Sequence, residues 1–287
     1  MAKSTQVQKT PKAAPPSVET AMPDFMKGLQ GQGTENLGMK DIETPRLKLL
    51  QMTSKECVEH EGASPGMWWH TVLEKPFPKE LVGVPLFIDI RYLLWRPLDD
   101  GGGILARADD AMHWSPPNIA FKVKINKKTK EVIWRTAKTV AESGLDQWGT
   151  YDPDDPSSQP AATLMYNIVM ALPDYPEVGP SVVTFQRTGV PIAKKLGGKL
   201  KLAKAPSYGI KFMMSHTAET NNADQTYLVP KMTMAGYVTD QNQFNEYKEL
   251  YELFKKIGVN VKDLEGAQED EPATGTGSAG DKDSKDY

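Results

Sequence analysis

The chain has a single cysteine, Cys57, among its 287 residues. One thiol cannot close an internal disulfide, so a cystine-stapled secreted scaffold is excluded and a reducing compartment is indicated. No apolar run approaches the roughly 20 residues that a membrane-spanning helix needs. The first 20 residues contain lysines but no apolar segment, so they do not form a secretory signal. From these absences we expect a cytoplasmic protein without a membrane contact.

The sequence also lacks the motifs of common enzyme classes. Residues 62–66, GASPG, have the G-x-S-x-G spacing of a hydrolase nucleophile. Pro65 follows the serine, however, and has no backbone N–H to build an oxyanion hole. The glycine runs at 101–103 and 197–198 lack the spacing of a phosphate-binding loop. We therefore expect a protein that is not an enzyme, although the 37 acidic residues leave acid–base pairs open.

Sets of metal ligands are incomplete. Cys57 and His60 form a C-x-x-H pair, but zinc takes four ligands and no matching pair follows. Residues 152–156, DPDDP, offer carboxylates, but two prolines and no glycine turn distinguish them from an EF-hand loop. The sequence therefore predicts no metal and no cofactor.

Negative charge is concentrated at the C-terminal end. The net charge of the chain is only −3, but residues 263–287 contain eight acidic residues and two lysines, a net charge of −6. The preceding 262 residues therefore carry a net charge of +3. A mildly basic body with a strongly acidic tail indicates contact with nucleic acid or with a membrane surface.

The basic residues of the body form two clusters. One lies in the acid-free stretch between Glu177 and Glu219, and the other lies in residues 119–140, which contain one acid, Glu131. The acid-free stretch contains Arg187, Lys194, Lys195, Lys199, Lys201, Lys204 and Lys211. Residues 119–140 contain Lys122, Lys124, Lys127, Lys128, Lys130, Arg135 and Lys138.

Aromatic residues are interleaved with both clusters: Phe121 and Trp134 in residues 119–140, and Phe185, Tyr208 and Phe212 in the acid-free stretch. Lysines neutralise phosphates, and flat rings stack on unpaired bases. The combination indicates a surface for single-stranded nucleic acid. The alternative is that both clusters are solvated faces of ordinary strands.

Several segments have the composition or the alternation of β-strands. Residues 83–97 are rich in β-branched and aromatic residues and predict a long buried strand. Residues 121–136 predict a hairpin, because Phe121, Val123 and Ile125 alternate with polar residues. Further strands are predicted over residues 180–188, 207–216 and 226–239, the last with Pro230 at a sheet edge or a bulge.

Three helices are predicted. Residues 161–172 follow a proline-rich loop and stop at Pro173, and a short helix begins at Pro191 and ends at Gly197. The third has Asp240 as its N-cap and ends at Gly258. Its aromatic stripe, Phe244, Tyr247, Tyr251 and Phe254, is typical of a packed helix face. These elements predict a β-rich α+β fold.

The chain thus divides into three parts. Residues 1–40 are rich in Pro, Gln, Gly, Thr and Lys and predict a disordered arm. Residues 41–262 predict one β-rich domain that binds nucleic acid. Residues 263–287 predict a disordered acidic tail.

The segment DKDSKDY, Asp281 to Tyr287, resembles the tails of bacterial and bacteriophage single-stranded DNA-binding proteins. In these proteins an OB-type barrel binds the strand, and an acidic tail ending in an aromatic residue recruits replication enzymes. The bacterial pattern ends in Pro-Phe, whereas here Lys282 and Lys285 dilute the charge. Residues 41–51 and 185–196 are similar to tailed-phage proteins with this role. The resemblance implies an elaborated OB-like barrel with a C-terminal amphipathic helix.

We therefore expect a sequence-nonspecific single-stranded DNA-binding protein of phage replication or recombination. Its tail would recruit partner proteins and compete for the DNA groove. A virion or assembly protein is the alternative. The expected DNA-binding residues are Lys122, Lys124, Lys127, Lys128, Trp134, Arg135, Arg187, Lys194, Lys195, Lys199, Lys201, Lys204, Tyr208, Lys211 and Phe212. The expected partner-binding residues are Asp281, Asp283, Asp286 and Tyr287.

Overall fold

The computed structural model describes residues 33–34, 36, 44–95, 103–124, 132–151, 155–220 and 224–259, with the backbone alone for 121–124 and 132–134. The chain divides into two units, Met1–Ile42 and Glu43–Tyr287. The fold below is that of the second unit. Most of the expected N-terminal arm and the whole of the expected acidic tail lie outside the described residues.

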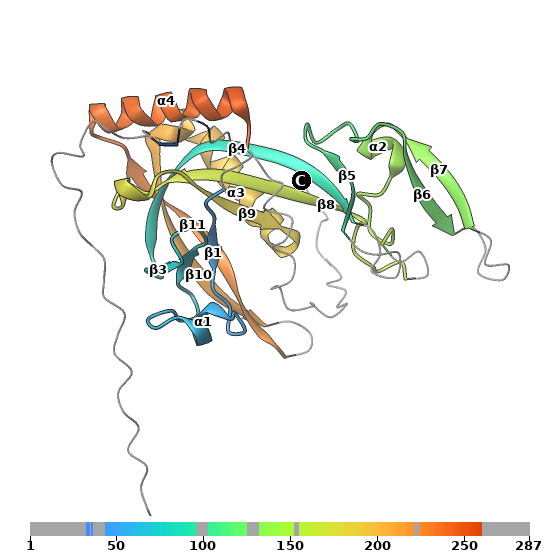
Figure 1. The fold of residues 1–287 in the computed structure, drawn as a ribbon, viewed down its shortest axis with the longest axis horizontal. Helices are drawn as coiled ribbons and strands as arrows, with labels where there is room; N and C mark the ends of the chain where they lie inside the picture. Colours follow the sequence, from blue (N-terminus) through green and yellow to red (C-terminus); the bar gives the residue numbers. More distant parts are fainter. Residues whose placement is uncertain are drawn as a thin grey trace, which may run out of the picture. The chain divides into compact units, whose positions relative to one another are not determined.

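The centre of the fold is an antiparallel sheet with the strand order β11-β10-β4-β8-β9, in which β5 also pairs with β4 (Figure 1). Its longest strand, β4, pairs with β8 from Val84↔Ala171 to Leu94↔Ala162. The strands are β4 (Leu81–Trp95), β5 (Ile104–Ala108), β8 (Ala162–Ala171), β9 (Ser181–Gln186), β10 (Ile210–Thr220) and β11 (Thr226–Tyr237). The α+β class is confirmed. Among the described residues the sheet does not close into a barrel, so the expected OB-like barrel is not confirmed.

Both faces of this sheet are covered. On β8, Ile168 and Met170 belong to a core shared with helix α3 (Val190–Leu202), while Val169 and Ala171 pack with helix α4 (Gln241–Ile257). The prediction of a helix over residues 161–172 is therefore wrong. Because β8 is buried on both faces over most of its length, its sequence is apolar apart from Thr163 and Asn167 and lacks the alternation that marks a half-buried strand.

A small sheet completes the core on the α3 side. It consists of β1 (Leu47–Leu49), β2 (Trp68–His70) and β3 (Lys75–Phe77), in the order β1-β2-β3. Trp68 and Phe77 are almost fully buried against the main sheet. The backbone beside β1 also closes the β9 edge, where the Val182 N–H donates to the Pro45 carbonyl at 2.8 Å.

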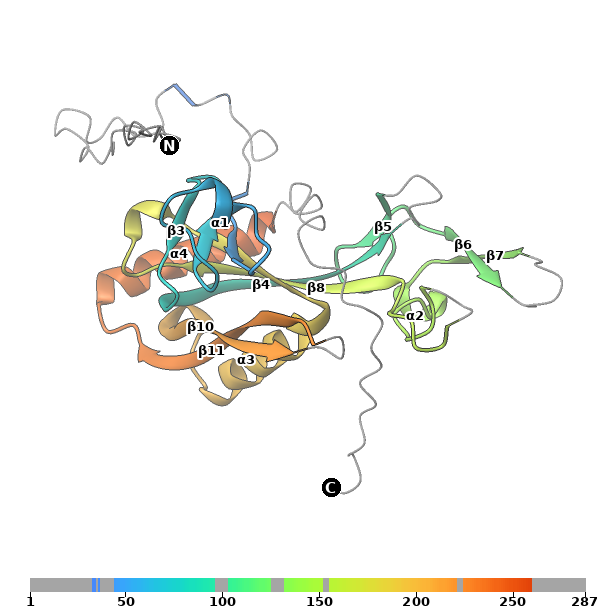
Figure 2. The same cartoon turned by 90° about the horizontal axis from the view of Figure 1, so that it is seen from below.

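The predicted hairpin over residues 121–136 is confirmed as β6 (Ile119–Lys124) and β7 (Val132–Ala137), which pair from Ile119↔Ala137 to Lys124↔Val132. It belongs to a separate lobe with β5 and helix α2 (Val140–Ser143), built around its own apolar cluster. This hairpin lobe lies at the end of β4 and β8 that is away from α4 (Figures 1 and 2).

Three features prevent a further strand from pairing with β11, the other edge strand of the sheet. Pro230 has no N–H to offer, which confirms the prediction that it marks an edge. The Gln51 side-chain amide donates to the Leu228 carbonyl at 3.0 Å and accepts from the Leu228 N–H at 2.8 Å. The Lys199 Nζ donates to the Met232 carbonyl at 2.6 Å. Edge strands guarded in this way resist pairing with another chain.

Of the two long helices, α4 agrees with its prediction and α3 is longer than predicted. The α4 prediction is confirmed, because the Asp240 carboxylate accepts from the Gln243 N–H at 2.8 Å and Gly258 ends the helix with φ 72°. The α3 helix is longer than predicted: it continues through Gly197 and Gly198 to Leu202. No described helix is both long and apolar enough to cross a membrane.

Candidate nucleic-acid interface

Helix α3 separates apolar from cationic side chains. Ala193 and Leu196 point into the core and are buried, as the helical spacing of apolar residues requires. Lys194, Lys195 and Lys201 lie on the solvent side. Pro191 stands in the first turn, where its missing N–H costs no hydrogen bond.

Four lysines, which we call the basic face, are exposed on α3 and in the turn after it: Lys194, Lys195, Lys201 and Lys204. None of the four forms an ion pair with a residue that the structure describes. The acid-free sequence between Glu177 and Glu219 is the reason, because it supplies no carboxylate nearby along the chain. Charges of one sign gathered in this way raise the local concentration of anions.

The other basic residues of the acid-free stretch are placed differently. Lys199 is half-buried and uses its Nζ to hold the β11 edge. Arg187 is half-buried in the 3-10 turn Arg187–Gly189 that precedes α3. Lys211 neighbours the buried Phe212 on β10, so its side chain leaves the sheet on the face opposite to α3. The structure therefore brings four of the seven predicted residues together.

Of the three aromatic residues among the expected DNA-binding residues, Trp134, Tyr208 and Phe212, two have rings that are occupied by packing. Phe212 is fully buried, so its ring cannot meet a base and that assignment is corrected. The Tyr208 ring centroid lies 5.2 Å from those of both Phe244 and Tyr251 of α4, and Tyr208 is half-buried. The Trp134 side chain lies outside the described atoms.

The strand register offers other exposed side chains beside α3. Met234 pairs with Phe212, and Tyr237 pairs with Ile210. Directly opposed residues of antiparallel strands point to the same face, so both side chains lie on the face that α3 covers. Tyr237 is 51% exposed and Met234 is 39% exposed. Sequence reasoning missed Tyr237, because a bulge between Lys211 and Phe212 shifts the pairing there.

The second basic cluster is not joined to the first. Arg135 and Lys138 of the hairpin lobe are exposed, whereas the side chains of Lys122, Lys124, Lys127 and Lys128 lie outside the described atoms. The hairpin packs on the lobe's own core, while α3 packs on the main core. Figures 1 and 2 both show the hairpin and α3 in different parts of the unit. The described members of the two clusters therefore do not line one continuous groove.

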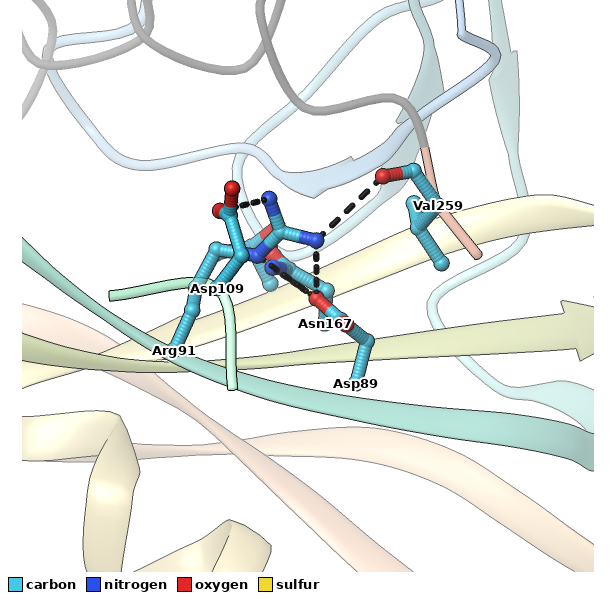
Figure 3. Close-up of polar contacts among 6 residues, drawn as sticks. Asp89, Arg91, Asp109, Asn167 and Val259 are labelled. Atoms are coloured by element: carbon cyan, nitrogen blue, oxygen red, sulfur yellow. Dashed lines mark hydrogen bonds and ion pairs between the residues drawn. The ribbon is translucent and has the colours of Figure 1, made fainter. Parts of the chain in front are cut away.

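A buried polar network lies on the other face of the sheet (Figure 3). Arg91 donates from Nε to Asp89 at 2.7 Å, from Nη1 to Asp109 at 3.0 Å, and from Nη2 to the Val259 carbonyl at 3.3 Å. Asn167 donates to Asp89 at 3.3 Å and accepts from the Thr184 hydroxyl at 2.9 Å. Because every charged group has a partner, the network has the character of a structural anchor. It fixes the chain directly after α4.

The described residues contain neither a cluster of metal ligands nor an activated thiol. No group of three or more His, Cys, Asp or Glu side chains within the described ranges could hold a metal ion. Burial first, and then the nearby Glu56, raise the pKa of the Cys57 thiol, so this thiol is not activated at neutral pH.

An exposed aromatic loop was missed by sequence reasoning. Trp148 is 70% exposed and Tyr151 is 49% exposed in the connection between α2 and β8. The Thr150 hydroxyl ties the two ends of this loop, since it donates to the Leu145 carbonyl at 3.0 Å and accepts from the Ala161 N–H at 3.0 Å. The signal available in the sequence was a tryptophan in a Pro- and Asp-rich loop, where no core pattern requires it.

The structure defines a strand-rich α+β protein with an exposed basic face on and after α3. Residues 14–260 match the model of the Pam3 phage gp34-like protein family. The chain belongs to this family and is a bacteriophage protein. No curated protein matches the chain, and no solved structure matches it either.

Proposed function

We propose that this phage protein binds single-stranded DNA without sequence preference and has no chemistry of its own. The observation that carries the proposal is the basic face: four exposed lysines on and after α3, without ion pairs to the described residues. Lysines that retain their full charge gain free energy from releasing the counterions of a phosphate backbone. Lysines on a helix surface bind phosphates whatever the base sequence. Recognition of particular bases instead requires fork-shaped or amide side-chain donors held in fixed positions at the base edges.

Tyr237 takes the stacking role in this proposal, in place of Phe212 and Tyr208. It lies on the α3 side of β11 and keeps half of its surface exposed. Stacking of one base on such a ring contributes roughly 1–3 kcal/mol. Arg135 and Lys138 of the hairpin lobe form a second, separate contact with the same strand. The finer assignment to an OB-type replication or recombination protein rests on the sequence resemblance alone.

The acidic segment 263–287 acts as a tethered competitor in this proposal and recruits partner proteins when DNA displaces it. Its net charge of −6 complements the basic face. It follows Val259, whose carbonyl is anchored by Arg91 on the sheet face opposite to α3. Its 25 residues span up to about 80–90 Å when extended, which is enough to reach around a sheet edge. Because the acidic segment is tethered to the domain, its effective concentration at the basic face is high.

The test is a titration of fluorescent oligonucleotides, single- and double-stranded, at two salt concentrations. We expect preference for the single strand, a steep loss of affinity with salt, and tighter binding after deletion of residues 263–287. Equal binding by the truncated and intact proteins at low salt would remove the competitor role alone. Absence of binding at low salt, together with co-purification with phage particles, would instead favour a virion or assembly protein.

A further inference from the structure

The hairpin lobe presents a rigid apolar surface that nothing in the described chain covers. Trp148 and Met112 are 70% and 59% exposed, and both flank α2, where the Val140 N–H donates to the Met112 carbonyl at 2.9 Å. Tyr151 adds a third exposed side chain. Several large apolar side chains exposed on one small lobe favour an interaction site there.

The aromatic loop, residues 144–151 and 155–160, is held in one conformation. The Gly149 N–H donates to the Ser158 carbonyl at 2.7 Å, and the Tyr151 N–H donates to the Gln159 carbonyl at 3.1 Å. Gly149 has φ +80°, and a Cβ there would lie 3.1 Å from the Pro156 carbonyl oxygen. Only glycine fits this position without strain. The loop is therefore ordered before any partner arrives, which lowers the entropic cost of docking.

The charged residues on α2 and in the described part of the loop are negative, whereas Lys138, just before α2, is an exposed cation. Glu142, Asp146 and Asp155 lie on α2 or within the loop, and all three are at least partly exposed. Bonds from the Ser157 side chain and backbone lower the pKa of Asp155, so this carboxylate stays ionised. Lysine ammonium groups are attracted both to these carboxylates and to the tryptophan face.

The same chain carries a surface with the complementary properties. Leu202, at the end of α3, is 82% exposed and stands next to the lysines of the basic face. Gly198 lies in the middle of this exposed side, and a Cβ on either Gly197 or Gly198 would meet no atom within 4 Å. Packing inside the chain therefore does not require these glycines, although each costs a helix about 1 kcal/mol. An exposed glycine leaves a flat place where a large ring can lie against the helix.

We propose that the aromatic loop of one copy docks on the basic face of a second copy, with Trp148 over Gly198 and beside Leu202. The two surfaces differ and lie in different parts of the unit, so the contact is head-to-tail. The shared basic face makes this contact mutually exclusive with DNA binding and with docking of the acidic segment 263–287, a point that rests on the proposed function. The contact area is small, so the association is weak and sensitive to salt.

Sedimentation velocity without nucleic acid tests this contact on the full chain and on the chain lacking residues 263–287, which are proposed to compete for the same face. We expect the sedimentation coefficient to rise with protein concentration at low salt, and the rise to disappear at about 0.5 M salt. Trp148→Ala and the double variant Lys194→Glu/Lys201→Glu should each lower the association constant about tenfold or more. Val58→Ala, which removes an 89% exposed side chain elsewhere, is the matched control and should associate like the unmodified chain.

Mixing the two defective variants is the decisive step. Each retains one intact surface, so an equimolar mixture should form a dimer that does not grow further. A chain that stays monomeric at low salt both with and without residues 263–287, or a mixture of the two variants that stays monomeric in both forms, would overturn the proposal. So would a Trp148→Ala variant that self-associates normally but binds oligonucleotide less tightly. The proposed DNA binding is judged separately, because its titration uses the unmodified chain with nucleic acid.

Discussion

Replacement of Arg91 by leucine should be the most destabilising single change in the described polar network. The Arg91 side chain is only 8% exposed and that of Asp89 only 13% exposed, so Arg91→Leu leaves the Asp89 carboxylate nearly buried without its cation. Removing one partner of a buried ion pair costs about 3–5 kcal/mol. The change also frees the Val259 carbonyl, and with it the anchor of the chain after α4.

Urea unfolding followed by circular dichroism measures this loss as a shift in midpoint at constant slope. Arg91→Leu/Asp89→Asn should recover about 1–3 kcal/mol relative to Arg91→Leu, because the second change removes the unpaired buried charge. Two controls are matched. Asp109→Asn alters the 59% exposed partner of the same arginine, and Lys255→Ala breaks an exposed pair with Glu252; each should cost about 1 kcal/mol or less.

The reasoning would be refuted if Arg91→Leu cost under about 1 kcal/mol, as a surface pair does. It would equally be refuted if Asp89→Asn gave no recovery in the Arg91→Leu background. Either result would mean that water reaches these side chains and that the network does not anchor the chain after α4.

Three further predictions concern single positions. Gly149→Ala should cost about 1–3 kcal/mol in urea unfolding, because it combines a positive φ with a Cβ 3.1 Å from Pro156. Gly198→Ala should do the opposite, raising the unfolding free energy by up to about 1 kcal/mol while weakening self-association in sedimentation. His70 is buried, and desolvation first and then Lys75 lower its pKa below 6.5, so the folded protein binds this proton less tightly than the unfolded chain. The unfolding free energy should therefore be complete above about pH 6.5 and fall as the pH drops below it, and His70→Gln should show a flatter profile between pH 5 and 7.

Elements with an unambiguous period could be predicted from the sequence. The alternation of Phe121 and Val123 with lysines predicted the hairpin, and the Asp240 cap with its aromatic stripe predicted α4. Pro230 identified the edge strand without any knowledge of its neighbours. In each case the signal is local, because it depends on one face or on one missing hydrogen bond.

Elements buried on both sides could not be predicted in the same way. The sequence of β8 contains Ala, Leu and Met, which favour helix, and Pro173 follows as a helix stop would. Its strand conformation is decided by β4 and β9 on either side, which local propensity does not encode. Gly197 and Gly198 similarly indicated a helix end, but Leu196 before them and Leu200 beyond them both pack on the core, and α3 continues to Leu202.

The candidate site was predicted only in part, because composition indicates where charge is concentrated but not which side chains are buried. The acid-free stretch identified the basic face, because lack of carboxylates is a property of composition. Composition does not tell which rings are buried, so Phe212 and Tyr208 were assigned to DNA although they pack in the core and under α4. The separation of the hairpin from α3 follows from sheet topology, which no local pattern shows.

The salt dependence of oligonucleotide affinity tests the central claim most directly. Lys194, Lys195, Lys201 and Lys204 are changed together to glutamine, and the control changes Lys79, Lys248, Lys255 and Lys256, which are exposed on other elements. Each phosphate contact contributes about 0.7 to the slope of log affinity against log salt, so loss of four should flatten the slope by about 3 and weaken binding by two to three orders of magnitude at about 0.1 M salt. A slope that the basic-face variant and the control variant share would contradict the assignment of this face to DNA.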